Sequence, residues 1–304
     1  MKHISIKRKQ GSYGDKIFDK VNLIFMVVLL LIFAWPLWFV VIASFSDPHA
    51  VMTGQVLLWP KGIVLDGYKK MLGYTQLWTG YANTIFYTAA GTLLNLVLSV
   101  CFAYPLAGRN FKPRKFFLLA FVFTMYFSGG MIPTYLVVKD LHLLDTRWAM
   151  IIPTAISVYN CLIIRSYFMN SIPIELEEAS KIDGANSAQY LWKVVLPLSK
   201  PVLAVVGLYY AVSHWNDYYH ALLYLYDDKL YPMQSVLRNL LLSTSSLIDE
   251  IGGVTDPEAM DAAFNTVLSM KYCVVIAAAV PMLCVYPFIQ KFFIKGVMVG
   301  SVKG

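Results

Sequence analysis

The residues of this chain that could carry reactive chemistry are scattered along it. Its five histidines form no H-E-x-x-H or similar spacing. Its four cysteines all lie in apolar runs without a C-x-x-C pair, which is typical of small buried hydrophobes rather than disulfides or metal ligands. No G-x-x-x-x-G-K-[ST] phosphate loop occurs, so the chain is not expected to bind ATP. We therefore expect no catalytic residue, no metal site and no cofactor bound by this chain.

Another kind of chemistry is available where aromatic and amide side chains gather near residue 216. Ring faces and amide groups are suited to binding a sugar, and further amides and a tyrosine lie within other apolar runs. Two alternatives stay open: an aromatic belt at the membrane interface, and hydrogen bonds to neighbouring helices, for which Asn95 is also suited. The candidates for a substrate path are Trp215, Asn216, Tyr218, Tyr219, Asn83, Tyr159 and Asn160.

The elements that position these residues are predicted to be membrane helices. Hydrophobic residues make up 58% of the 304 positions and charged residues only 14%, against about 25% charged in a typical soluble domain. A spanning helix needs about 20 mostly apolar residues. Six runs approach this length, at 21–45, 81–106, 116–138, 148–168, 202–215 and 272–293. We expect an all-α integral membrane protein whose six transmembrane helices form one domain, 21–293, with an uncleaved first helix.

The distribution of Lys and Arg predicts the orientation. Most of the 25 basic residues fall in segments that share one side of the membrane if the N-terminus is cytoplasmic. This places a basic N-terminal segment (1–20), the loop 169–201 and the tail 294–304 in the cytoplasm, and the loop 227–271 outside. Both termini are then cytoplasmic. The same bias accounts for the net charge of +7, so no nucleic-acid partner is needed.

The distribution of acidic residues indicates how transport is powered. Ion-coupled carriers keep ionisable groups within the bilayer, yet none of the 18 acidic residues lies in the middle of a predicted span. An ion-coupled secondary transporter of a polar solute stays as the alternative, because carbonyls and hydroxyls alone can bind Na⁺. A membrane-embedded enzyme would need a catalytic cluster, which the sequence lacks. Active transport would therefore use an ATPase on another polypeptide.

The inner loop 169–201 is the segment suited to contact such an ATPase. Pro173 and the glutamates after it favour a helix start, and Gly184 favours a helix end. A second short helix is predicted from about Asn186 to Val195. The first helix would present Leu176, Ala179, Ser180 and Asp183 on one side. A docking knob and an amphipathic connector lying in the interface are both compatible with this pattern.

One motif in this loop resembles a family signature. Glu178-Ala179-Ser180, three residues, Gly184, nine residues and Val194-x-Leu196-Pro197 resemble the "EAA" signature of ABC import permeases. Both spacings agree, and the departures at Ser180 and Val194 are conservative. Segments 128–133, 143–146, 215–216 and 295–304 extend the resemblance to the carbohydrate branch, with its maltose and lipo-oligosaccharide-type permeases.

The resemblance implies a type I ABC importer permease fold in the bacterial cytoplasmic (plasma) membrane. It implies a transmembrane subunit that forms half of a pore for a sugar or oligosaccharide, in contact with lipid. The implied partners are a second, homologous permease, two copies of an ATPase that uses ATP and Mg, and an extracytoplasmic solute-binding protein. The tail 295–304 would reach the ATPase. The implied coupling residues are Glu178, Ala179, Ser180, Asp183, Gly184, Leu196 and Pro197.

Overall fold

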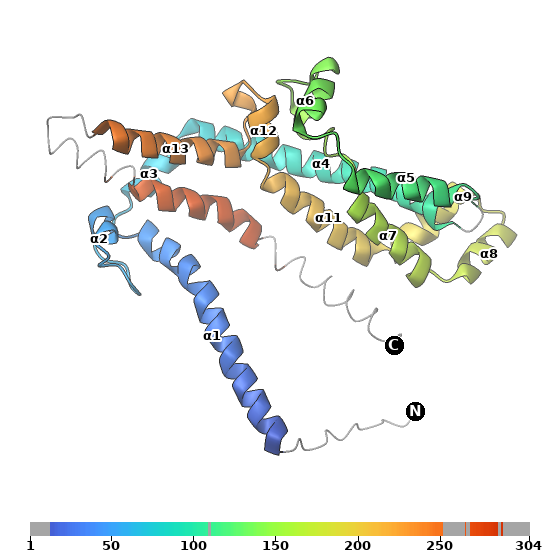
Figure 1. Cartoon of the computed structure of the whole chain (residues 1–304), viewed down its shortest axis with the longest axis horizontal. Coiled ribbons are helices and arrows are strands. Elements are labelled where there is room, and N and C mark those ends of the chain that lie inside the picture. The colour runs from blue at the N-terminus through green and yellow to red at the C-terminus, as the bar shows by residue number, and fades with distance from the viewer. Residues whose placement is uncertain (1–12, 109–110, 252–264, 266–267, 285–286, 288–304) are drawn as a thin grey trace. The chain divides into compact units, whose positions relative to one another are not determined.

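Regular structure is helical throughout the part of the chain described by the computed structural model, residues 13–108, 111–251, 265, 268–284 and 287. The all-α prediction is confirmed over these residues (Figure 1). The chain divides into two compact units. One comprises Met1–Lys69 with Glu250–Ile276, and the other comprises Lys70–Asp249 with Ala277–Gly304.

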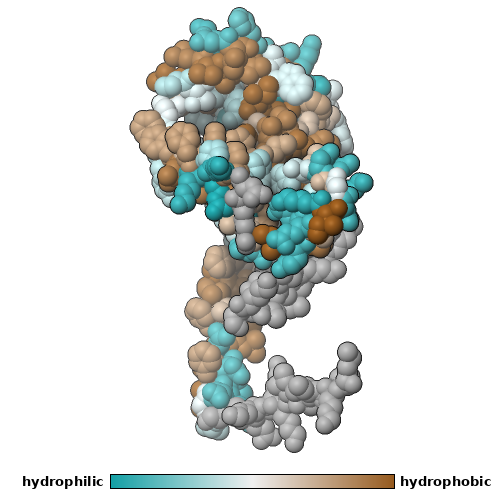
Figure 2. Space-filling model, turned by 90° about the vertical axis from the view of Figure 1, so that its right-hand side faces the viewer, coloured by the Kyte–Doolittle hydropathy of each residue, from teal (hydrophilic) through white to brown (hydrophobic). Residues whose placement is uncertain are grey.

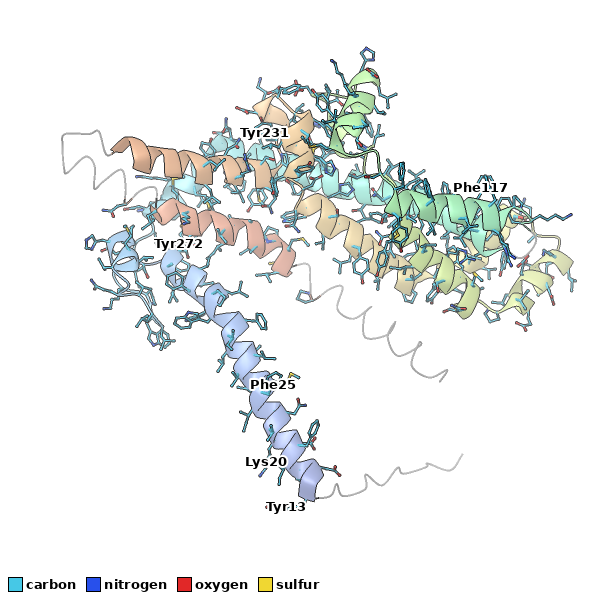
Figure 3. The ribbon with its side chains drawn as sticks, viewed as in Figure 1. Tyr13, Lys20, Phe25, Phe117, Tyr231 and Tyr272 are labelled. Carbon is cyan, nitrogen blue, oxygen red and sulfur yellow. The ribbon has the colours of Figure 1, made fainter. Side chains whose placement is uncertain are left out.

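The first unit is dominated by α1 (Tyr13–Ser44). Its hydrophobic side chains point outward around the helix, as at Phe25 in Figure 3, and most of them are exposed. Water would disfavour so much apolar surface, whereas lipid tails accept it. Only the end of α1 is buried, where Ile42 and Ala43 pack with α2 (Pro48–Met52) and Val56.

The second unit is built around α4 (Thr75–Ala107), which packs against α11 (Lys200–Trp215) and α7 (Val158–Ser171). Their shared core contains Ala103, Ile164, Phe168, Val202 and Val206. The outward-facing apolar side chains of this unit remain exposed, and Figure 2 shows brown hydrophobic residues on the surface of one face. An apolar exterior of this kind is expected for helices that contact lipid.

Two sharp bends interrupt the apolar runs of this unit. α5 (Arg114–Tyr126) and α6 (Met131–Asp140) meet at 112°, and Gly130 between them has a φ of +88°, which favours glycine. The segment Ser187–Leu198 comprises α9 (Ser187–Tyr190), a π-helical turn (Leu191–Val195) and α10 (Leu196–Leu198), and it meets α11 at 81°.

The spans differ in detail from the sequence-based prediction. α1 and α4 are each long and apolar enough to cross a membrane, and the described residues contain up to four such spans when each bent pair counts as one. The expected continuous helix at 148–168 is wrong. Its first part forms the 3₁₀ helix Arg147–Met150 and turns, because Pro153 has no N–H for a helical hydrogen bond, and the Thr154 carbonyl accepts from Asn95 Nδ2. The apolar helix Leu268–Cys284 falls in the sixth run, which lies partly outside the described residues.

After α11 the chain forms the short helix α12 (Tyr219–Tyr224), a 3₁₀ turn (Asp228–Leu230) and α13 (Met233–Ile251). α13 therefore lies within the segment 227–271 that was predicted to be a loop outside the membrane. α13 begins close to α4, since a Cβ on Gly80 would lie 3.1 Å from the Met233 Cα.

Candidate functional site

The loop 169–201 contains the two short helices predicted for it. α8 (Ile174–Ile182) follows Pro173, and Glu175 and Glu177 lie in its first turn, where they favour the positive end of the helix. Gly184 ends it with a φ of +75°, and a Cβ added to this glycine would meet no atom within 4 Å, so backbone conformation rather than space calls for glycine. α9 then begins with a capping box formed by Asn186 and Gln189.

The two helices of this loop differ in how firmly they are held. Tyr190, the last residue of α9, and Val195 in the π-helical turn that follows are buried in the core beside Ile164 and Phe168. In contrast, all nine residues of α8 are half-buried or exposed, and Ile182 is 86% exposed. The loop is therefore anchored through α9 and presents α8 on the surface (Figure 1).

The polar side chains of α8 and of Asp183, which follows it, fall into two groups. Lys181 Nζ lies 2.6 Å from Glu177 Oε1, and the Ser180 hydroxyl donates to the Glu177 carbonyl at 2.8 Å. Within the described part of the chain, the carboxylates of Glu178 and Asp183 accept no hydrogen bond and form no ion pair. The exposed face of α8 thus carries charge without an internal partner, which is what a docking surface requires.

A cavity of about 780 Å³ opens beside α8. Its walls come from the end of α4, the start of α5, the end of α7 and the loop 169–201. Arg114, Glu175, Glu177 and Lys181 contribute charge to it, and Tyr104 and Phe168 contribute aromatic surface.

α4 carries a buried polar stripe, formed by residues at every fourth position that face the interior of the unit. It consists of Asn83, Tyr87, Gly91, Asn95 and Ser99. Near one end, Asn83 Nδ2 donates to the Lys229 carbonyl at 2.7 Å, and the Tyr87 hydroxyl donates to the Leu230 carbonyl at 2.8 Å. These bonds satisfy carbonyls of an irregular segment that forms no α-helical hydrogen bonds there.

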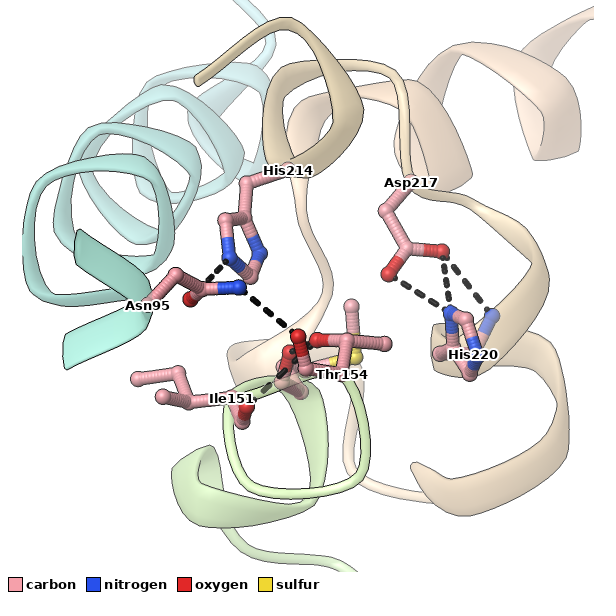
Figure 4. Close-up of polar contacts among 7 residues, drawn as sticks. Asn95, Ile151, Thr154, His214, Asp217 and His220 are labelled. Carbon is pink, nitrogen blue, oxygen red and sulfur yellow. Dashed lines mark hydrogen bonds and ion pairs between the residues drawn. The ribbon is translucent and has the colours of Figure 1, made fainter. Parts of the chain in front are cut away.

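The middle of the buried polar stripe bonds to the non-helical segment that precedes α7 (Figure 4). Asn95 Nδ2 donates to the Thr154 carbonyl at 2.7 Å, and His214 Nε2 lies 3.2 Å from Asn95 Oδ1. Gly91 makes room for this histidine, because a Cβ there would lie 2.4 Å from His214 Nε2. One turn along α4, Ser99 Oγ lies 2.7 Å from the Tyr210 hydroxyl, which also accepts from the Ser157 N–H at 3.2 Å.

The candidates for the substrate path separate into two groups. Buried ones have internal partners: Asn83 donates to backbone carbonyls, Trp215 Nε1 donates to the Ala278 carbonyl at 3.4 Å, and Asn160 is 6% exposed. These contacts favour the helix-to-helix alternative for Asn83, as for Asn95. The exposed candidates are Tyr159, Asn216, Tyr218 and Tyr219.

Asp145 is a residue whose role the sequence did not indicate. Its Oδ1 accepts the N–H groups of Asp227 and Tyr226 at 2.9 and 2.8 Å, which lower the pKa of the carboxyl group below its usual value. The segment 143–146 was recognisable as a motif, and Asp145 has a φ of +56° that is unusual for a non-glycine residue. Asp145 therefore fastens the loop after α6 to the segment after α12.

Comparison with known proteins gives the family. The model of the family "Binding-protein-dependent transport system inner membrane component" matches residues 100–299. Protein LplC of Bacillus subtilis (strain 168) is 40% identical over 299 residues, covering 98% of this chain and 99% of that protein. The polygalacturonan/rhamnogalacturonan transport system permease protein YtcP of the same organism is 40% identical, covering 95% and 99%.

A solved structure agrees with this result. A bacterial ABC transporter involved in the import of the acidic polysaccharide alginate contains a chain of the same fold, with a TM-score of 0.84 and 34% identity over 94% of this chain and 99% of that chain. The ATPase of such systems is a separate polypeptide, and the family binds no cofactor. These matches exclude the secondary-carrier alternative. The chain belongs to the binding-protein-dependent transport system inner membrane components, as a multi-pass, non-catalytic permease subunit of a carbohydrate ABC importer.

Proposed function

We propose that this permease couples to its ATPase through α8. The observation that carries the proposal is the contrast within one loop: Tyr190 and Val195 hold α9 and the π-helical turn in the core, while α8 is exposed and its Glu178 carboxylate has no partner in the described residues. When a bound partner displaces such an exposed helix, the displacement is transmitted to the core helices against which the loop is packed.

The displacement would be transmitted along the chain from α8 to α11. Glu178, Ala179, Ser180 and Asp183 provide the contact surface, and Gly184 sets the turn into α9. Leu196 and Pro197 belong to α10, which meets α11 at the 81° bend. Closure of the ATPase pair would move α8 and shift this bend between two packings.

The proposed organisation follows the family. Six spans within 21–293 adopt the type I arrangement, with the segments 1–20, 169–201 and 294–304 in the cytoplasm and 227–271 outside. The tail, which lies outside the described residues, contacts the ATPase. The complex contains a second homologous permease, two ATPase copies and an extracytoplasmic solute-binding protein, embedded in lipid.

The proposed cargo is an oligosaccharide that contains uronate units. This cargo proposal rests on the names of similar proteins. One relative is called a polygalacturonan/rhamnogalacturonan transport system permease, and the similar solved structure is that of a transporter involved in the import of the acidic polysaccharide alginate. Tyr159, Asn216, Tyr218 and Tyr219 remain the exposed candidates for the path, and Trp215, Asn83 and Asn160 support it from buried positions.

Co-purification from membranes in mild detergent tests the coupling proposal. The wild-type chain is expected to retain the ATPase and a homologous permease, whereas Glu178→Ala and Gly184→Pro should lose the ATPase and keep the permease. Asp140→Ala, an exposed carboxylate at the end of α6, is the matched control and should retain both. Retention of the ATPase by both loop variants would overturn the role of α8.

Uptake by the reconstituted complex tests the cargo. Trigalacturonate is expected to compete with labelled uronate oligosaccharide, and maltotriose at the same concentration is not. Equal competition by the two trisaccharides would contradict the uronate proposal and leave the coupling proposal unaffected.

A further inference from the structure

A cluster of aromatic side chains joins α6 to α12. The ring of Tyr135 stacks on that of Tyr224 with centroids 6.3 Å apart, and the hydroxyls of Tyr135 and Tyr226 lie 2.8 Å apart. The Tyr219 hydroxyl donates to Met131 Sδ at 2.9 Å. Three contacts thus bring together residues from two segments that are about 90 positions apart in sequence.

The bend after α5 brings α6 to this place. The turn at Gly130, with its φ of +88°, directs α6 away from the line of α5 by 112°. Met131 and Tyr135 follow that turn directly and reach α12. The segment 128–133, which contributed to the family resemblance, therefore has a structural role: it assembles the aromatic cluster.

Two tyrosines of this cluster, Tyr219 and Tyr226, are exposed at the surface. Tyr219 is 46% and Tyr226 60% exposed, yet their hydroxyls are bound to Met131 and Tyr135. Tyrosines of a membrane-interface belt direct their hydroxyls to water and head groups. Here the hydroxyls of Tyr219 and Tyr226 bond to Met131 and Tyr135, which holds the two exposed rings in place within the cluster.

The carboxylates next to the cluster are already engaged. Asp217 Oδ2 lies 2.8 Å from His220 Nδ1, and Asp217 Oδ1 accepts the His220 N–H at 3.1 Å (Figure 4). Asp145 Oδ1 accepts two backbone N–H groups. Since each phenol has one proton and two acceptor lone pairs, the Tyr135–Tyr226 pair keeps one O–H that can donate to a ligand.

We propose that Met131, Tyr135, Tyr219 and Tyr226 form a platform on which one pyranose unit of the arriving oligosaccharide stacks. The C–H face of the sugar ring covers the exposed tyrosine rings, and a sugar hydroxyl accepts from the Tyr135–Tyr226 pair. The platform binds the ring and not its carboxylate, so it takes uronate and neutral pyranoses alike. This inference rests on the proposed function, because it names residues that would hold its cargo.

Transport by the full complex with its binding protein, reconstituted in proteoliposomes, tests the platform with trigalacturonate as the probe. Tyr219→Leu and Tyr226→Leu are expected to lower uptake at saturating binding protein about tenfold while ATP hydrolysis stimulated by the loaded binding protein persists. Tyr219→Phe and Tyr226→Trp keep a ring face and should lose clearly less uptake than the leucine variants. Wild-type uptake by both leucine variants would overturn the platform, and so would equal losses in the leucine and aromatic variants.

If the leucine variants fail to assemble into the complex, labelling of a cysteine on the platform provides a second test. The exposed Cys101 and Cys284 are replaced by serine, and Tyr226→Cys supplies a thiol on the platform. Trigalacturonate with binding protein should slow maleimide labelling of that thiol at least threefold, and unchanged labelling would refute the platform. Failure of the proposed cargo is distinguishable, because then the wild-type complex itself imports no trigalacturonate.

Discussion

α4 and α8 belong to the same unit, but their polar side chains have opposite surroundings. The amides and hydroxyls of the buried polar stripe on α4 bond to the chain itself, at Lys229, Leu230, Thr154 and Tyr210. α8 is half-buried or exposed throughout, and within the described residues its Glu178 has no partner. An amide or hydroxyl inside an apolar core must be satisfied internally, whereas a polar group on an exposed helix is free to meet another protein. The first region holds the permease together, and the second is available for coupling.

The largest expected effect comes from filling the space at Gly91. Gly91→Ala would place a Cβ 2.4 Å from His214 Nε2 and force the histidine away from Asn95. Alanine normally favours a helix over glycine by about 1 kcal/mol, but overpacking costs about 1–3 kcal/mol, so a net loss of stability is expected.

Thermal unfolding of the detergent-solubilised chain measures this effect. Gly14→Ala is the control, because nothing lies within 4 Å of a Cβ at that position of α1. A stabilised Gly91→Ala protein would show that His214 moves freely and would weaken the contrast between the two helices.

Tyr210→Phe should have the next largest effect, since it removes the hydroxyl that Ser99 and the Ser157 N–H share. Polar contacts between membrane helices contribute about 0.6 kcal/mol on average and about 1.7 at most, and a destabilisation in this range is expected. Tyr209→Phe on the exposed side of the same helix is the matched control. Equal midpoints of unfolding for the two variants would contradict a structural role of the buried polar stripe.

Asp145 lies between the two extremes, because it is exposed but has internal partners. Backbone N–H groups of Asp227 and Tyr226 lower its folded pKa, so its contribution to stability is present above the unfolded pKa of about 3.9 and is lost as the pH falls through the lower folded value. The stability difference between wild type and Asp145→Asn should be constant above about pH 5 and shrink below about pH 4. A difference that grows on acidification would mean that the hydrogen bonds do not favour the charged form.

The smallest effect is expected on α8. Lys181→Ala removes the exposed ion pair with Glu177, and such helix pairs contribute about 0.3–0.5 kcal/mol. Its unfolding midpoint should stay close to wild type, and the pair should weaken further at high salt. A loss as large as that of Tyr210→Phe would show that α8 contributes to the stability of the unit and is not only a docking surface.

The sequence predicted a large part of this protein because its main signals are local. Apolar length indicated the membrane helices, and the motif spacing around Glu178 and Gly184 indicated the family and the two helices of the inner loop. The helix end at Gly184 needed only its own backbone conformation. The bend at Gly130 and the non-helical stretch before Val158 were not predicted, because an apolar run looks the same whether it is straight or broken.

The sequence by itself determined the class of the protein, its helical content, its family and the location of the inner loop, since composition, apolar length and motif spacing are properties of neighbouring residues. Only the tertiary structure decided which polar residues are used internally. Asn83 and Asn216 are both amides at positions in or next to apolar runs, yet Asn83 is buried and bonds to the distant Lys229 carbonyl, whereas Asn216 is exposed and bonds to the Val212 carbonyl of its own helix. That difference depends on partners far away in sequence, which hydrogen bonding brings together only when the helices pack.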